Sequence, residues 1–522
     1  MRIDDLRAED TGFILSIDAG TTSVRTMLFA HDGRVLASSQ RPLRQIYPGP
    51  GMVEHDASEI WRLTKETMNE ALDRCPVNRS GCVAVAITNQ RETAVLWDRL
   101  TGSPLCNAIV WQDRRTQALC DSLNAEGLDE EVFRTTGLHV DPYFTGTKLR
   151  WMLDNVPDAE EKAESGRVLA GTVDSWLIWN LTGGREHVTD HSNASRTMLF
   201  DISALDWDDG LLDAVGVPRS ILPEPRPTCG AVGTTAPSVA GIDVPISASM
   251  GDQQAALFGQ QCFSEGDAKV TFGTGGFLLM NTGRRPLRSE HGLLTTVAWT
   301  SGDGATYAME GSVYMAGATI QWLRDELQIV ESSSETERMA ESVPDTGGCT
   351  IVPAFSGLGA PHWDKGARGM IMGLTRSTDR NHMARAALES IAFQARDVLE
   401  AMRKDADRDL TSIRVDGGAS ANGFLCGFLS DITGARVVRP RTIESTAMGA
   451  AFMAGLAEGF WTDRRDLASM WSLDREFLPS MPAEERERRI REWSKAVECA
   501  RAWSRICGGS RPPNGNNTRR TG

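Results

Sequence analysis

Three hydroxyl side chains gather in one short turn near the start of the sequence, after Gly20. They are Thr21, Thr22 and Ser23. The turn joins an apolar stretch that ends in Asp18 to a second apolar stretch, 24–30, and this pattern predicts a β-hairpin. Hydroxyl and backbone N–H donors in one turn suit the oxygens of a phosphate group. Arg25 adds a positive charge, and Asp18 is suited to hold Mg²⁺ through water.

Residues 269–281, KVTFGTGGFLLMN, repeat this design about 250 residues further on. A strand, a glycine-rich turn and an apolar strand again predict a hairpin. A Gly-Thr-Thr turn alone is more often only a turn. An internal repeat, however, predicts two related halves, and two facing hairpins would hold a chain of phosphates from both sides.

Two further polar pairs follow apolar segments. Arg91 and Glu92 end a polar cluster after a strand predicted over 83–87. Their fixed donors and acceptors suit a polyhydroxylated ligand, although a surface ion pair is the commoner case. Asp252 and Gln253 stand at the start of a helix predicted over 254–258, where an acid is either a cap or a catalytic group.

A third glycine-rich turn lies at 415–420, between a predicted strand and a helix predicted over 422–432. A β-turn-α-β unit of this kind suits the base and ribose of a nucleotide. The glycines lack the spacing of the dinucleotide-binding fingerprint, and the sequence contains no GxxxxGK[ST] motif.

The elements that must position these residues follow from apolar periodicity. A third strand, 35–38, extends the first hairpin into a meander. Helices are predicted over 54–73, 173–181, 315–327, 381–402 and 445–459, and the stretch 141–155 predicts a loop that feeds a short helix. Strands are predicted at 95–97 and 108–111, and 193–200 predicts a loop and a strand.

Length and composition narrow the class of protein. A chain of 522 residues predicts two or three domains. With 55 basic and 70 acidic residues the net charge is −15, which argues against nucleic acid as the main partner. Ten scattered cysteines without CxxC spacing predict reduced thiols. With a polar, acidic start and no apolar run of the ~20 residues that a membrane span needs, we expect a cytoplasmic protein.

Taken together, these segments resemble the FGGY carbohydrate kinases over about residues 13–503. Two stretches look like the family's signatures: 143–155, with Lys148 and Trp151, and 369–389, with its AALE ending. The runs ITNQRET, DPYF, SNASRTMLF, GDQQAALFGQ and QWLRDE point to the branch that phosphorylates glycerol.

The resemblance implies an α/β fold with two ribonuclease-H-like (actin-like ATPase) domains and a catalytic cleft between them. We expect an N-terminal domain over 12–258, with the polyol site and the first phosphate hairpin. The C-terminal domain, 259–507, would carry the second hairpin and the adenosine site, before a disordered tail, 508–522. The implied reaction is ATP- and Mg²⁺-dependent phosphorylation of glycerol to sn-glycerol 3-phosphate, in a homo-oligomer, either a dimer or a tetramer.

The resemblance also assigns roles to single residues, with Asp252 as the catalytic base and Asp18 as the acid on the magnesium side. The glycerol contacts it implies are Arg91, Glu92, Tyr143, Asp252 and Gln253, with Trp111 and Phe277 as the apolar wall. The nucleotide contacts it implies are Thr21, Thr22, Ser23, Arg25, Thr274, Gly317, Gln321, Gly418 and Asn422.

The sequence departs from the glycerol branch at three places. Ala19 stands where Gln is usual, Gly423 where a second Asn is common, and 234–245 has no clear match to a loop that binds a sugar-bisphosphate inhibitor in some bacterial members. Two alternatives stay open: a kinase for another polyol or sugar, and a non-catalytic actin-like protein. The presence of Asp252 and Arg91 argues against the second.

Overall fold

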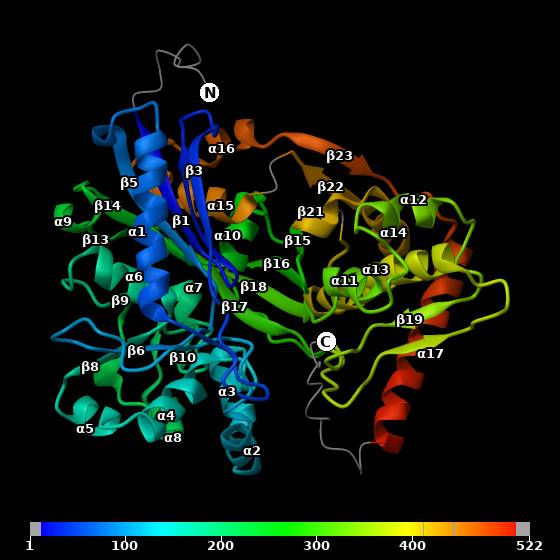
Figure 1. Ribbon diagram of the computed structural model, residues 1–522, viewed down its shortest axis with the longest axis horizontal. Coiled ribbons are helices and arrows are strands. Elements are labelled where there is room, and N and C mark those ends of the chain that lie inside the picture. Colours follow the sequence, from blue (N-terminus) through cyan, green and yellow to red (C-terminus); the bar gives the residue numbers. More distant parts are fainter. Residues whose placement is uncertain (1–11, 411, 442–443, 508–522) are drawn as a thin grey trace, which may run out of the picture.

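A six-stranded sheet forms the first half of the molecule in the computed structural model, which describes residues 12–410, 412–441 and 444–507. Its strand order is β13-β14-β5-β1-β2-β3 (Figure 1). The central strand β1 (Phe13–Ala19) pairs antiparallel with β2 (Ser23–Phe29), which pairs antiparallel with β3 (Val35–Pro42). This is the meander expected from the sequence.

Three strands of this sheet run parallel. On its other side β1 pairs with β5 (Cys82–Asn89), which pairs with β14 (Pro245–Gly251). Parallel neighbours end at the same edge of a sheet. Asp18 near the end of β1, Arg91 just after β5 and Asp252 just after β14 are therefore brought to one edge.

The second half repeats this design in a seven-stranded sheet of order β17-β18-β16-β15-β21-β22-β23. Here β15 (Ala268–Phe272) pairs antiparallel with β16 (Gly276–Gly283) and parallel with β21 (Ser412–Asp416). Beyond β16 lie β18 (Gly304–Val313) and β17 (Leu294–Ser301), and beyond β21 lie β22 (Arg436–Pro440) and β23 (Leu473–Phe477). The internal repeat predicted from the two hairpins is confirmed by this matching order.

Helices of both halves cover the two sheets (Figure 1). α1 (Ala57–Arg74) packs on β2 and β3, and α13 (Arg380–Ala406) packs on α14 (Gly423–Thr433) in the second half. α17 (Ala483–Cys507) runs along the outer side of the second half.

α15 (Ser445–Ala457) comes late in the sequence but packs on β1, β5 and β14 of the first sheet and on α10 (Asp252–Gly259). The two helices approach closely because Gly449 and Gly259 face backbone of the other helix. A Cβ on Gly449 would overlap the carbonyl oxygen of Ala255, and one on Gly259 would overlap that of Ser445. Packing between the two halves therefore reaches the helix that begins with Asp252.

A long insertion between β5 and β14 forms the cyan and green-cyan part of Figure 1. It contains the pair β6 (Val95–Asp98) and β8 (Val168–Gly171), and the helices α4 (Thr145–Asn155), α6 (Val173–Leu181) and α7 (His191–Ala194). This insertion supplies Trp111, Tyr143 and Arg196 to the region near the end of β5.

Most predicted elements are present, with shifted ends. α6 has the predicted bounds, and the helix predicted over 315–327 is α11 (Gly317–Asp325). The prediction for 193–200 was wrong in detail, since α7 reaches Ala194 and the strand β10 is only Phe200–Asp201. The strand predicted over 108–111 ends early, as β7 (Ala108–Ile109). The boundary between 258 and 259 stays a prediction, and the tail 508–522 lies outside the described residues.

Candidate active site

Four buried charged side chains form one network beyond the end of β5. Arg91 and Arg196 both bind Glu310: Arg91 Nη1 and Nη2 lie 2.5 and 3.0 Å from its two oxygens, and Arg196 Nη2 lies 2.9 Å away. Arg196 Nε also donates to Glu92 at 2.7 Å. Burial alone would raise the pKa of Glu310, but Arg196 and Arg91 outweigh it and lower that pKa to about 2. The reading of Arg91 and Glu92 as a surface ion pair is wrong, because both are buried.

Asp252 faces this network from the start of α10. Its Oδ1 lies 3.4 Å from Arg91 Nε, and 26% of its side chain is exposed, against 2% for Arg91. Gly251 occupies the N-cap position, so Asp252 lies inside the first helical turn rather than at the cap. Burial raises the pKa of Asp252, and Arg91 and Lys269 partly offset this. The partly exposed carboxylate of Asp252 therefore lies beside the buried guanidinium group of Arg91.

Three aromatic rings from distant parts of the chain meet next to these charges. The ring of Trp111 lies edge-on to Tyr143 and to Phe277, with centroid distances of 5.7 and 6.1 Å. Trp111 Nε1 also donates to Thr21 Oγ1 at 3.0 Å. The apolar wall implied by the resemblance is therefore assembled, and it touches the first hairpin turn on one side and β16 on the other.

The first hairpin turn holds Thr21, Thr22 and Ser23 together, and the nearby Arg25 is bound by other side chains. Arg25 forms an ion pair with Glu444, the residue before α15, and its Nη2 donates to Gln40 at 2.7 Å. Ser23 Oγ accepts from Gln40 Nε2 at 2.8 Å. Thr22 is exposed, whereas Thr21 is half-buried and its Oγ1 accepts from Trp111 Nε1.

The second hairpin turn packs on the start of α11. The backbone N–H groups of Ala316 and Ala318 both donate to the carbonyl oxygen of Thr274, at 3.0 Å. A Cβ on Gly317 would lie 2.6 Å from the carbonyl oxygen of Gly273, so only glycine fits there. Gln321, one turn later, is exposed.

The remaining predicted nucleotide contacts lie after β21. Gly418 is exposed at the start of a short helix, Gly418–Ala421. Asn422 caps α14 through Oδ1, which accepts from Leu425 N at 3.0 Å, and its Nδ2 donates to Thr336 at 3.2 Å. Asn422 thus has a structural role in addition to the one implied for it.

Asp18 lies close enough to Asp252 for the two charges to interact. Burial, and then the Asp252 carboxylate, raise the pKa of Asp18 to about 7. Two carboxylates that repel each other in a partly buried place suit a divalent cation, and Mg²⁺ prefers carboxylate and water oxygens. Among the described residues, no group of three or more His, Cys, Asp and Glu side chains is placed to hold a metal.

Sequence reasoning missed three charged residues in this region: Arg196, Lys269 and Glu310. Each carries a visible signal. Lys269 and Glu310 interrupt apolar strands, and Arg196 follows a run of small residues. Burying a charged side chain costs free energy unless it is paired. Each of these three residues therefore predicts a buried partner, but the sequence does not identify that partner.

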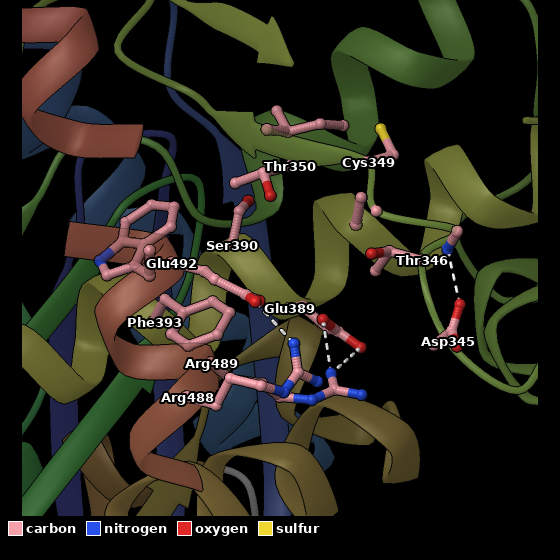
Figure 2. Close-up of a pocket in the computed structure, with 15 residues that line it drawn as sticks. Asp345, Thr346, Cys349, Thr350, Glu389, Ser390, Phe393, Arg488, Arg489 and Glu492 are labelled. Carbon is pink, nitrogen blue, oxygen red and sulfur yellow. Dashed lines mark hydrogen bonds and ion pairs between the residues drawn. The ribbon is translucent and has the colours of Figure 1, made fainter. Parts of the chain in front are cut away.

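A separate cavity of about 360 Å³ lies between residues 345–351, α13 and α17 (Figure 2). Its arginines already hold carboxylates: Arg489 Nη1 lies 3.1 Å from both oxygens of Glu389, and Arg488 Nη1 lies 2.6 Å from Glu492. The residues around Asp252 belong to a different part of the molecule, and the chemistry described above is located there.

Comparison with known proteins identifies the family of this chain. The model of the N-terminal domain of the FGGY family of carbohydrate kinases matches residues 13–259, and that of the C-terminal domain matches 268–458. The chain belongs to the FGGY family. The predicted family and fold class are confirmed.

Relatives within the FGGY family include glycerol kinases. The chain is 55% identical to the glycerol kinase of Symbiobacterium thermophilum, over 94% of this chain and 99% of that protein. It is 53% identical to glycerol kinase 2 of Thermotoga maritima, with the same coverage. The crystal structure of Plasmodium falciparum glycerol kinase with ADP superimposes with a TM-score of 0.89, at 36% identity, over 94% of this chain and 98% of that one.

A more distant solved structure shares the fold. Gluconate kinase from Lactobacillus acidophilus superimposes with a TM-score of 0.85 at 22% identity, over 95% of this chain and 99% of that one. The fold is therefore shared by kinases whose names give different substrates, and the substrate must be argued from the site.

Proposed function

We propose that this protein transfers the γ-phosphoryl group of ATP to glycerol and releases sn-glycerol 3-phosphate and ADP. The observation that carries the proposal is the position of Asp252, whose carboxylate lies 3.4 Å from the buried Arg91 and opens toward the site. The identity of 52–55% to proteins named glycerol kinase supports the choice of substrate. It is further supported by the compact aromatic wall of Trp111, Tyr143 and Phe277, which favours three carbons over five or six.

Glycerol is held through its hydroxyl groups. Arg91 and Glu92 hold two of them, and Asp252 and Gln253 orient the terminal one that reacts. Hydrogen bonds to charged groups contribute about 1.5–3 kcal/mol each. Two or three of them, with apolar contact to the wall, reach the ~7 kcal/mol that a ligand with a Kd of ~10 μM needs.

In the chemical step the terminal hydroxyl oxygen forms a bond to the γ-phosphorus. The bond from that phosphorus to the β,γ-bridging oxygen breaks, and the electron pair leaves with ADP. Asp252 accepts the hydroxyl proton. Phosphoryl transfer has a loose transition state, so positioning and charge neutralisation supply most of the catalysis.

The two hairpin turns hold the phosphates from opposite sides in this proposal. Thr21, Thr22, Ser23 and Arg25 act from the first sheet, and Thr274 from the second. Gly317, Gln321, Gly418 and Asn422 contact the rest of the nucleotide. Closure of the two domains excludes water, which otherwise competes with glycerol as acceptor.

Mg²⁺ fits the acidic place formed by Asp18 with Asp252 nearby. Asp18 would hold the ion through water. The bound ion would supply positive charge beside the phosphates. Asp252, whose neighbours are Arg91 and Lys269, is left to accept the proton.

The remaining features of the proposal concern the whole protein. Nucleic acid is not a partner, and the chain acts in the cytoplasm as a homo-oligomer, a dimer or tetramer. In the part of the chain that the structure describes, no helix is long and apolar enough to cross a membrane.

An ADP-release assay with a panel of acceptors tests the proposal. The panel contains glycerol, dihydroxyacetone, erythritol and a pentulose, each with Mg²⁺-ATP. We expect the highest kcat/KM with glycerol. A preference for the pentulose would assign another substrate, and ADP release that ignores every acceptor would instead support a non-catalytic, nucleotide-dependent role.

A further inference from the structure

Lys269 is a buried cation that the proposed mechanism does not use. It lies in β15, the first strand of the second sheet, and its side chain is fully buried. Its Nζ donates to Gln253 Oε1 at 2.5 Å and to Thr271 Oγ1 at 2.8 Å. The contact with Gln253 joins the second sheet to α10, next to the residue that accepts the proton.

The chemistry of the two groups fixes how the Gln253 amide is turned. An ammonium group has three donors and no acceptor, whereas a glutamine amide has one acceptor oxygen and one donor nitrogen. The atom of Gln253 that faces Lys269 must therefore be its carbonyl oxygen. The Nε2 group is consequently directed away from Lys269 and is left to donate elsewhere.

A hydrogen-bond donor on Gln253 would complement Asp252, which only accepts. A hydroxyl group that reacts must give its proton to one partner while its oxygen is held by another. Asp252, as a carboxylate, only accepts. Gln253, turned by Lys269, supplies the donor that Asp252 cannot, and the two neighbours in the chain then define both the place and the direction of one hydroxyl group.

Two carboxylates near Lys269 favour its charged form. Burial lowers the pKa of Lys269 to about 8, and the carboxylates of Asp416 and Asp252 oppose this. A buried cation costs free energy that an apolar residue in β15 would not. Its presence in a buried strand therefore calls for acceptor partners, and Gln253 is the one that lies outside the strand.

We propose that Lys269 is a positioning residue: its ammonium group holds the Gln253 amide so that Nε2 donates to the hydroxyl oxygen that attacks the γ-phosphorus. The inference rests on the proposed function and adds a residue of the second half to the acceptor site. In this proposal Lys269 acts on the hydroxyl group through the Gln253 amide, whose oxygen its Nζ contacts.

A double-mutant cycle tests this most directly. Lys269→Met, Gln253→Ala and the double variant are assayed as full-length protein with glycerol and Mg²⁺-ATP. We expect K269M to lower kcat/KM for glycerol about 10- to 100-fold, which corresponds to one hydrogen bond at a charged site. The KM for ATP should stay within about twofold, since the two residues act on the acceptor only.

The activity of the double variant toward glycerol is the decisive result. If Lys269 acts through Gln253, the double variant is as active as Q253A, because there is no amide left to orient. Losses that multiply in the double variant, or a K269M protein with wild-type activity toward glycerol, would overturn the proposal. The wild type in the same assay tests the proposed function separately, since its failure would appear as no glycerol-dependent ADP release.

Two further variants keep the test informative if K269M does not fold. Gln253→Glu leaves Lys269 paired with a carboxylate but removes the N–H donor, so it should lose as much activity as Q253A in a stable protein. Full activity of Q253E would overturn the proposal by itself. As a matched control, Thr271→Val removes the other acceptor of Lys269 and leaves the contact with Gln253, so it should lose less activity than K269M.

Discussion

Glu310 lies in β18 of the second sheet and Arg91 follows β5 of the first, yet they form a buried ion pair through two atoms each. The distances are 2.5 Å from Arg91 Nη1 to Oε2 and 3.0 Å from Nη2 to Oε1. Arg196 binds the same carboxylate at 2.9 Å. The residue proposed to hold glycerol is therefore itself held by the second half of the molecule, and the geometry of the acceptor site depends on how the two halves meet.

Replacing Glu310 tests whether the acceptor site depends on the contact between the two halves. Glu310→Gln keeps the shape but leaves Arg91 and Arg196 buried with less opposing charge. Breaking a buried ion pair costs about 3–5 kcal/mol, so we expect a lower melting temperature and a KM for glycerol raised at least about tenfold. Glu66→Gln, which removes an exposed pair with Arg62, serves as the control and should change neither quantity. Unchanged glycerol kinetics in E310Q would show that Arg91 does not need Glu310.

Glu92 should matter for glycerol far more than for the nucleotide. Glu92→Gln removes the charge that Arg196 contacts at 2.7 Å and weakens an acceptor proposed for a glycerol hydroxyl. We expect calorimetry to show glycerol binding weakened about tenfold or more, with ATP binding nearly unchanged. An equal loss for both ligands would mean that Glu92 only supports the fold.

Trp111 connects the polyol wall to the first hairpin through one hydrogen bond, to Thr21. Trp111→Phe keeps an aromatic ring against Tyr143 and Phe277 but removes the indole donor. A neutral hydrogen bond contributes about 0.5–1.5 kcal/mol, so we expect kcat to fall about 2- to 13-fold with little change in glycerol binding. Trp111→Ala, in contrast, should weaken glycerol binding. If W111F and W111A behave alike in both assays, the hydrogen bond to Thr21 has no separate role.

The close contact between α10 and α15 predicts that a larger residue at Gly449 lowers the stability of the protein. Gly449→Ala adds a methyl group against the backbone of Ala255, and overpacking of this kind costs about 1–3 kcal/mol. We expect a lower melting temperature and reduced activity, because α10 begins with Asp252. Gly302→Ala, where a Cβ meets nothing within 4 Å, is the matched control. A G449A protein as stable as G302A would contradict the close packing of the two helices.

The sequence indicates which polar residues could lie together, because several of them come at the ends of apolar strands. Asp18, Arg91 and Asp252 each come at or just after the end of an apolar strand, and such ends meet at one edge. The two hairpins are recognisable for the same local reason. The hairpins and the strand ends depend on neighbouring residues only, so they can be inferred without knowing the whole fold.

Other features depend on contacts across the whole chain. Arg91 and Glu310 are 219 residues apart, and nothing in the local sequence around either residue specifies the other. α15 lies late in the sequence, within the half predicted as the second domain, but packs on the first sheet. Lys269 could be recognised as a charge in an apolar strand, but its partner Gln253 is identified only once α10 and β15 are placed together.

The most direct measurement of the central claim uses Asp252→Asn, which keeps the shape of the side chain and removes its basicity. Glycerol binding is measured by calorimetry, and phosphoryl transfer is followed in a single turnover with Mg²⁺-ATP. A general base contributes about 10²- to 10⁴-fold to the rate, so the account predicts nearly intact glycerol binding and transfer below about 1% of the wild-type rate. A D252N protein that binds glycerol and still transfers phosphate at more than a few per cent of the wild-type rate would contradict it.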